Sequence, residues 1–146
     1  MPLARQLPLR IGILGTAAIA RSFVMGVRPS KSVSIHAVAS RAPDKAARFA
    51  EEMAISRAYG SYAELLADPE IDAVYNPLPN ALHAAWSIRA ARAGKHVLCE
   101  KPLAANASEV RAMFNAAREH GVHLVEGFPY VSGNFATYFR NLMPAG

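Results

Sequence analysis

The sequence has very little cysteine, and no stretch of it is apolar enough to cross a membrane. Cys99 is the only cysteine among 146 residues, which excludes an internal disulfide and is typical of a reducing compartment. No apolar run approaches the ~20 residues that a membrane-spanning helix needs. Residues 1–10 contain arginines but no apolar segment after them, so we expect no secretory signal. These features predict a cytoplasmic protein without a membrane anchor.

The sequence also lacks the patterns of nucleic-acid-binding and metal-binding proteins. The net charge of +5 suits an anionic ligand, but the 16 lysines and arginines are scattered and are not interleaved with aromatic residues. The histidines do not have the spacing of metal ligands, and Gly121 interrupts any helix that His120 and His123 would share. We therefore expect no nucleic-acid partner and no metal site.

The length and composition are those of one globular domain. The 146 residues are 52% hydrophobic and 18% charged, which is enough apolar material for a core. Short apolar runs alternate with amphipathic stretches, and this alternation predicts βαβ units: an α/β fold with a doubly wound, mainly parallel sheet. The expected strands are 11–14, 33–39, 58–59, 71–75, 96–100 and 122–126, and the expected helices are 17–24, 43–53, 61–68, 81–93 and 106–120.

A candidate phosphate-binding turn follows the first expected strand. The pattern Gly15-x-Ala17-x-x-Ala20 is a variant of the dinucleotide-binding fingerprint. A helix that begins at such a turn directs free backbone N–H groups and the positive end of its dipole toward an anion such as a pyrophosphate. Ala20 permits close helix–strand packing, whereas the methyl group of Ala17 lies where the pyrophosphate approaches the backbone. The alternative is an ordinary strand–turn–helix.

Polar residues and prolines gather after the expected strands. In a doubly wound sheet the ligand lies across the carboxyl ends of the strands, so we expect a functional crevice there. Glu126 ends the last strand, and we expect it either to act in this crevice or to make a structural pair. The segments at the strand ends are 15–16, 40–41, 76–80, 100–102 and 126–128.

The end of the second expected strand favours NADP over NAD. A site that requires NAD usually has an acidic residue there, which accepts a hydrogen bond from the ribose 2′-hydroxyl. This sequence has Ser40-Arg41, with Lys45 one helical turn later. An arginine binds a 2′-phosphate that a carboxylate would repel. The alternative is that Arg41 is a solvated loop residue, neutralised by Asp44.

Lys101 is the candidate catalytic residue. It follows the fifth expected strand and lies between Glu100 and Pro102. A lysine near a carboxylate in a partly dry crevice can donate to, or exchange a proton with, a substrate oxygen. The alternative is a surface lysine at a strand end. Cys99 and Trp86 are expected to pack in the core instead.

Four motifs in order resemble one family. The sequence from about Leu9 onward is similar to the glucose–fructose oxidoreductase, inositol dehydrogenase and MocA family, especially its dihydrodiol and xylose dehydrogenase-like branch. This branch tolerates alanine at the position of Ala17. The motifs are Gly15-Thr-Ala-x-Ile-Ala20, Tyr75-Asn-Pro-Leu-Pro-Asn-x-x-His83, Ala93-Gly-Lys-His-Val-Leu-Cys-Glu-Lys-Pro-Leu103 and Val125-Glu-Gly-Phe128.

The resemblance implies an N-terminal Rossmann domain that binds NADP or, less favourably, NAD. It implies that residues 15–19 line the pyrophosphate and that Ser40-Arg41 line the adenosine ribose. The loop at 77–80 and His83 are implied to lie near the nicotinamide, and Lys101 is implied to be catalytic. The expected cofactor-binding residues are Gly15, Thr16, Ala17, Ala18, Ile19, Ser40, Arg41, Lys45, Pro77, Leu78, Asn80, His83, Glu100 and Lys101.

The sequence departs from the family in length and at one motif. Members are about twice as long, and their second, sheet-rich domain binds substrate and forms the oligomer interface. We therefore expect a domain core at about 9–128, followed at 129–146 by a linker and an amphipathic stretch. After Phe128 the branch often continues with an aromatic residue, arginine and His-Pro, but this sequence continues with Pro-Tyr-Val-Ser-Gly-Asn-Phe.

Two functions are consistent with these observations. The first is the cofactor half of an NADP-dependent oxidoreductase, which acts on a sugar, polyol or cyclic diol and assembles as a homo-oligomer. The alternative is a truncated or non-catalytic NAD(P)-binding module. Both need the same fingerprint, so the sequence does not decide between them.

Overall fold

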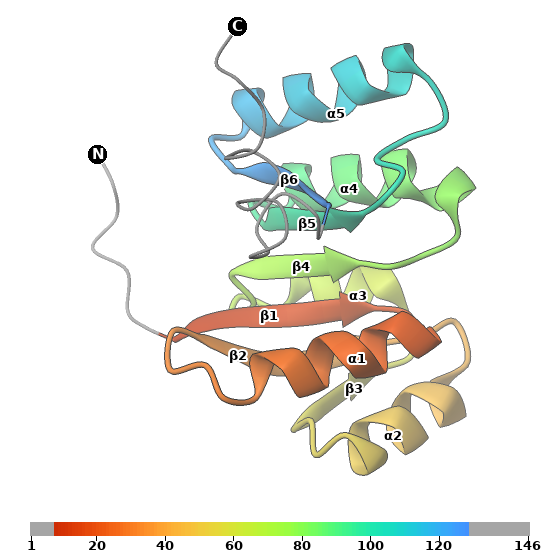
Figure 1. Ribbon diagram of the computed structural model, residues 1–146, viewed down its shortest axis with the longest axis vertical. Helices are drawn as coiled ribbons and strands as arrows, with labels where there is room; N and C mark the ends of the chain where they lie inside the picture. Colours follow the sequence, from red (N-terminus) through yellow and green to blue (C-terminus); the bar gives the residue numbers. More distant parts are fainter. Residues whose placement is uncertain (1–7, 129–146) are drawn as a thin grey trace, which may run out of the picture.

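A six-stranded parallel sheet is the centre of the fold, as the sequence predicts (Figure 1). The structure is a computed structural model that describes residues 8–128. The strand order is β3-β2-β1-β4-β5-β6, the order of a doubly wound Rossmann sheet. The strands are β1 (Leu9–Leu14), β2 (Val33–Ala39), β3 (Arg57–Tyr59), β4 (Ala73–Asn76), β5 (His96–Glu100) and β6 (Leu124–Gly127).

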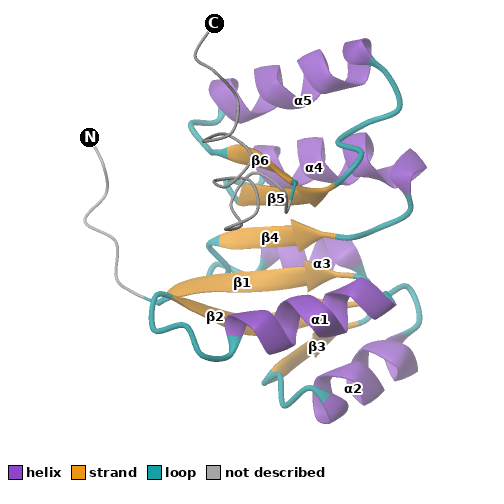
Figure 2. Cartoon of the chain, viewed as in Figure 1, coloured by secondary structure: helices purple, strands orange, loops and turns teal. Residues whose placement is uncertain are grey.

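Helices cover both faces of this sheet (Figure 2). Helices α1 and α2 lie on one face, and α3, α4 and α5 lie on the other. None of the helices within residues 8–128 is long and apolar enough to span a membrane. The helices are α1 (Ala18–Val27), α2 (Pro43–Glu52), α3 (Tyr62–Ala67), the 3-10 turn η1 (Asn80–Leu82), α4 (His83–Arg92) and α5 (Ala107–Glu119).

The predicted elements are all present, and three of the boundary shifts have a clear cause in the structure. The helix expected at 81–93 is divided, because the η1 turn precedes α4. Strand β4 begins at Ala73 instead of 71, since Ile71 N–H donates to Asp68 O in a turn. Strand β6 begins at Leu124 instead of 122, since Val122 N–H closes the end of α5. The predicted linker and amphipathic stretch at 129–146 lie outside the described residues.

Strand β1 separates two apolar clusters. Ile11 and Ile13 pack in the cluster beneath α1 and α2, and Leu14 packs in the cluster beneath α3, α4 and α5. Gly12 lies on the same side as Leu14, and a Cβ atom there would come within 2.7 Å of Leu65 Cδ2. The absence of a side chain at Gly12 therefore lets α3 pack directly on the central strand.

Side-chain caps begin two helices on this second face. The Ser61 hydroxyl accepts from Glu64 N–H at 3.2 Å, and Asn106 Oδ1 accepts from Glu109 N–H at 2.9 Å. The Glu64 side chain in turn accepts from Gly60 N–H at 3.1 Å. These bonds satisfy N–H groups that a helix leaves open.

Asp68 follows α3 and connects several segments on the side of the sheet opposite the carboxyl ends of the strands. Its carboxylate is 7% exposed and accepts at 2.8 Å from the Tyr59 hydroxyl, from Arg57 and from Glu70 N–H. Burial raises the pKa of Asp68, but the Glu70 N–H, Tyr59 and Arg57 outweigh it and lower the pKa to about 2. Buried Lys95 Nζ donates to the Asp68 carbonyl at 2.6 Å.

The Asp68 cluster predicts a specific acid sensitivity. The pKa of Asp68 is about 2 in the folded chain against an ordinary 3.8, so the unfolded chain binds the proton more tightly. Its stabilisation is complete above pH 4 and is lost as the pH falls to 2. We expect Asp68→Asn to lower the free energy of unfolding at pH 7 by about 1.5–3 kcal/mol, measured by urea titration.

The control is Asp44→Asn, which removes an exposed ion pair with Arg48 on α2. This variant should change the free energy of unfolding by less than about 0.5 kcal/mol. The difference between wild type and Asp68→Asn should shrink between pH 4 and pH 2. A difference that stays constant over this range would contradict the role assigned to Asp68.

Candidate functional site

A crevice lies where the strand order reverses, between the carboxyl ends of β1 and β4. Its volume is about 420 Å³, which is in the range of small-molecule sites. The ends of β1, β2 and β4 all contribute to it, as expected for a doubly wound sheet. The lining residues are Gly15, Thr16, Ala17, Ser40, Arg41, Ala42, Lys45, Tyr62, Pro77, Leu78 and Pro79.

Gly15 shapes the turn at the centre of this crevice. Its φ of +93° lies in the region that favours glycine. A Cβ atom there would come within 3.0 Å of Leu78 Cδ2. The Gly15 N–H donates to Ala39 O at 2.7 Å, so the turn is joined to the end of β2. Both the conformation and the space require glycine.

The first turn of α1 leaves its N–H groups open toward the crevice. Ala17 is the N-cap and has no side chain that caps the helix, and the first turn contains no acidic residue. Helices α3 and α5, in contrast, are both capped by side chains. Ala18 and Ile19 are exposed at this end. Open N–H groups and the helix dipole together favour an anion.

Two cations face the same crevice without an acidic partner. Arg41 and Lys45 are exposed, and neither side chain makes an ion pair or hydrogen bond within residues 8–128. Asp44, the acidic residue that would neutralise Arg41, pairs with Arg48 at 2.7 Å instead. Buried Ser40 accepts from Ala42 N–H at 3.2 Å, which shapes the corner. The arginine is therefore available for an anionic ligand.

Asn76 holds the loop that forms the opposite wall. It is fully buried at the end of β4, and its Oδ1 accepts from Leu78 N–H at 3.3 Å. Its Nδ2 donates to His83 O at 3.2 Å and to Ser87 Oγ at 3.1 Å. This side chain replaces backbone bonds that the prolines of loop 77–79 cannot donate.

His83 joins this loop to the loop after β5. The side chain is 1% exposed, with Nε2 2.7 Å from Leu78 O and Nδ1 2.8 Å from Pro102 O. The structure thus places His83 beneath the loop as a positioning residue. A contact of its own with a cofactor stays a prediction.

Lys101 lies at the end of β5, next to β4. Its side chain is exposed, and its N–H donates to Glu100 Oε2 at 3.2 Å. Glu100 Oε1 accepts from the Tyr75 hydroxyl at 2.7 Å, and Tyr75 stacks on Phe23 with ring centres 3.9 Å apart. Burial and the Glu100 carboxylate raise the pKa of Tyr75. The Lys101–Pro102 peptide is cis. The predicted carboxylate beside Lys101 is therefore fixed by contacts on both oxygens.

The structure separates the predicted site residues into two groups. One group is gathered around the crevice and comprises Gly15, Thr16, Ala17, Ser40, Arg41, Lys45, Pro77 and Leu78, with Ala18 and Ile19 in the adjoining turn of α1. The other group follows β4 and β5: Asn80 begins η1, His83 begins α4, and Glu100 and Lys101 lie at the end of β5.

Three residues have structural roles. Cys99 is fully buried, and this burial raises the pKa of its thiol to about 11, which confirms its place in the core. Trp86 packs edge-on against Tyr62, with ring centres 4.9 Å apart. Glu126 Oε1 accepts from Leu103 N–H at 2.9 Å, so Glu126 makes a structural pair. Residues 8–128 hold no group of three side chains arranged as metal ligands.

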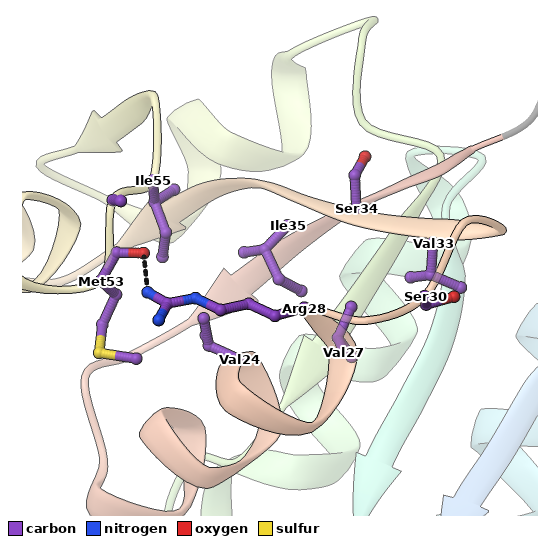
Figure 3. Close-up of a pocket in the computed structure, with 10 residues that line it drawn as sticks. Val24, Val27, Arg28, Ser30, Val33, Ser34, Ile35, Met53 and Ile55 are labelled. Atoms are coloured by element: carbon purple, nitrogen blue, oxygen red, sulfur yellow. Dashed lines mark hydrogen bonds between the residues drawn. The ribbon is translucent and has the colours of Figure 1, made fainter.

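A second cavity, of about 210 Å³, lies between the end of α1, the start of β2 and the end of α2 (Figure 3). The Arg28 side chain extends along it and donates to Met53 O at 3.1 Å. Val24, Ile35 and Ile55 form apolar walls. It is remote from the carboxyl ends of the strands and contains none of the predicted site residues.

Sequence reasoning missed Tyr62 and Ala42 as crevice residues. Ser61 correctly marks the start of α3, but the sequence contains no spacing that relates Tyr62 to the Gly15 turn. The two meet because α3 packs beneath β1 and β2, a contact between segments nearly fifty residues apart. Only the tertiary structure shows this neighbourhood.

Relatives in sequence match most of this chain. D-xylose 1-dehydrogenase (NADP(+)) 2 of Haloferax volcanii is 50% identical over 125 residues, which cover 84% of this chain and 38% of that protein. The uncharacterized oxidoreductase ORF334 of Rhizobium meliloti is 49% identical over 119 residues, which cover 81% of this chain and 36% of that protein.

A solved structure has the same fold. KijD10, a 3-ketoreductase from Actinomadura kijaniata in complex with NADP and TDP-benzene, superposes with a TM-score of 0.88 at 38% identity, over 92% of this chain and 42% of that one. The chain thus spans between 36% and 42% of the length of these three proteins. The profile of the GFO_IDH_MocA family matches residues 9–128, and the chain therefore belongs to this oxidoreductase family with an NAD-binding Rossmann fold.

Proposed function

We propose that this domain binds NADP in the crevice beside the α1 N-terminus. The observation that carries the proposal is the pair of unpartnered cations, Arg41 and Lys45, at the corner where an NAD site has a carboxylate. The Haloferax volcanii relative is named as NADP-dependent, and KijD10 is solved with NADP. Both support the same cofactor for this chain.

The residues of the crevice fit the two anionic parts of NADP. The open N–H groups at 16–19 suit the pyrophosphate, because they carry the positive end of the helix dipole. Arg41 and Lys45 suit the 2′-phosphate, since both are charged and exposed. The Gly15 turn, which a Cβ atom would close against Leu78, leaves room for close approach to the backbone.

For the whole protein we propose an oxidoreductase that acts on a sugar, polyol or cyclic diol. When bound, the nicotinamide supplies the hydride chemistry. Lys101 then holds or transfers the proton on the substrate oxygen, and Glu100 fixes the backbone at Lys101. Relatives named for D-xylose, a dTDP-linked deoxysugar and a dihydrobenzenediol support this substrate range.

The second candidate is a non-catalytic NAD(P)-binding module. It needs the same crevice and the same cations, so cofactor binding does not distinguish it from the enzyme. For either function we propose a cytoplasmic protein without nucleic-acid or membrane partners, consistent with its scattered charges. We propose that any homo-oligomer interface lies outside residues 8–128.

Arg41→Ala should weaken binding of NADPH far more than binding of NADH. The loss of a charged hydrogen bond to the 2′-phosphate costs about 1.5–3 kcal/mol, which corresponds to about 10- to 150-fold in the dissociation constant. Fluorescence titration with both nucleotides measures the two constants. Arg111→Ala is the control, because Arg111 is exposed on α5 and does not line the crevice. Equal losses for NADPH and NADH would remove the role assigned to Arg41.

Lys101→Ala should lower turnover by about 10²- to 10⁴-fold in the complete protein, because general acid–base groups contribute that much. Affinity for NADPH should change little, since the Lys101 side chain does not line the crevice. Initial-rate kinetics and a binding titration separate the two effects. Retention of near-normal turnover would return Lys101 to the role of a surface lysine.

The 146-residue chain alone should bind NADPH and show no dehydrogenase turnover. All the crevice residues lie within it, whereas Lys101 is exposed and lines neither of the two cavities described above. We therefore expect that the chain alone does not hold a substrate against Lys101. A titration and a spectrophotometric assay with xylose, glucose, inositol and a cyclic diol test both statements. Robust turnover would contradict this expectation, and failure to bind NADPH and NADH would refute the proposed function.

A further inference from the structure

Tyr62 brings a phenol hydroxyl to the floor of the crevice. The residue is 6% exposed at the start of α3, and its ring packs edge-on against Trp86 at an interplanar angle of 83°. Its hydroxyl lies 3.8 Å from the position that a Cβ atom on Gly15 would take. The ring is therefore fixed in the core while its oxygen lies beside the turn at the start of α1.

The Tyr62 hydroxyl has no partner within residues 8–128, although its ring is buried. Two other tyrosines show the usual arrangement: the Tyr59 hydroxyl donates to Asp68 at 2.8 Å and the Tyr75 hydroxyl donates to Glu100 at 2.7 Å. Buried polar groups are normally paired. The Tyr62 oxygen is not sealed in the core, because Tyr62 lines the crevice. A ligand in the crevice can therefore supply a hydrogen-bond partner for the Tyr62 hydroxyl.

We propose that the Tyr62 hydroxyl donates a hydrogen bond to the pyrophosphate of the bound dinucleotide. This inference rests on the proposed function. A pyrophosphate bound at the α1 N-terminus would lie beside the Gly15 turn, and a hydrogen bond to a charged phosphate is stronger than one between neutral groups. Tyr62 is thus a cofactor-positioning residue, and it reaches the phosphate turn from the opposite face of the sheet to α1.

The test is Tyr62→Phe in the 146-residue chain, since phenylalanine keeps the ring against Trp86 and removes only the oxygen. We expect the dissociation constant for NADPH to rise about 5- to 30-fold. ADP, which carries the pyrophosphate, should lose affinity by a similar factor, whereas adenosine 2′-monophosphate should lose none. The thermal midpoint without ligand should stay unchanged, because the hydroxyl has no partner in the protein.

The matched control is Tyr59→Phe, whose hydroxyl bonds to Asp68 away from the crevice. This variant should lower the thermal midpoint and leave the NADPH affinity at the wild-type value. Equal NADPH affinity of wild type and Tyr62→Phe would overturn the inference. So would a lower midpoint of unliganded Tyr62→Phe, or an equal loss for adenosine 2′-monophosphate. Failure of the wild type to bind NADPH would instead overturn the proposed function, and the inference with it.

Discussion

The close contact between the Gly15 turn and Leu78 is the constraint on which the crevice depends. Gly15 adopts a φ of +93°, and the 3.0 Å between its missing Cβ and Leu78 leaves no room for a side chain. This contact joins the end of β1 to the loop after β4 at the point where the strand order reverses. Because the chain leads from β1 to α1 on one face of the sheet and from β4 to α4 on the other, the two connections separate and leave a space for a ligand.

Two sets of polar contacts hold the walls of this space in place. Asn76 and His83 use buried side-chain atoms to fix loop 77–79 and to join it to Pro102 after β5. Tyr75 and Glu100 fix the backbone at Lys101 from the other face of the sheet. The cofactor side and the proposed catalytic side are therefore connected through β4 and β5. These connections fix the backbone at Lys101, and its side-chain amine makes no hydrogen bond within residues 8–128.

The crevice is positively charged because Arg41 and Lys45 have no acidic partner within residues 8–128. Several charged groups of the described residues are neutralised locally, as Asp44 is by Arg48 and Asp68 is by Arg57. Arg41, Lys45 and the open first turn of α1 are not, and all three face one cavity. An uncompensated positive field of this kind attracts anions. The Tyr62 hydroxyl is a neutral donor that also lines this crevice and has no partner within residues 8–128.

The sequence by itself determined the alternation of strands and helices, the glycine turn and the residues at the strand ends. It did so because apolar periodicity, capping residues and glycine act locally. It left open whether Asp44 neutralises Arg41 and whether Glu126 is structural, since both questions depend on which side chain lies within reach. Only the tertiary structure decided them, and only it brought Tyr62 to Gly15 and His83 to Pro102. These contacts join segments far apart in the chain, and their distances follow from helix packing on the sheet, which no local pattern encodes.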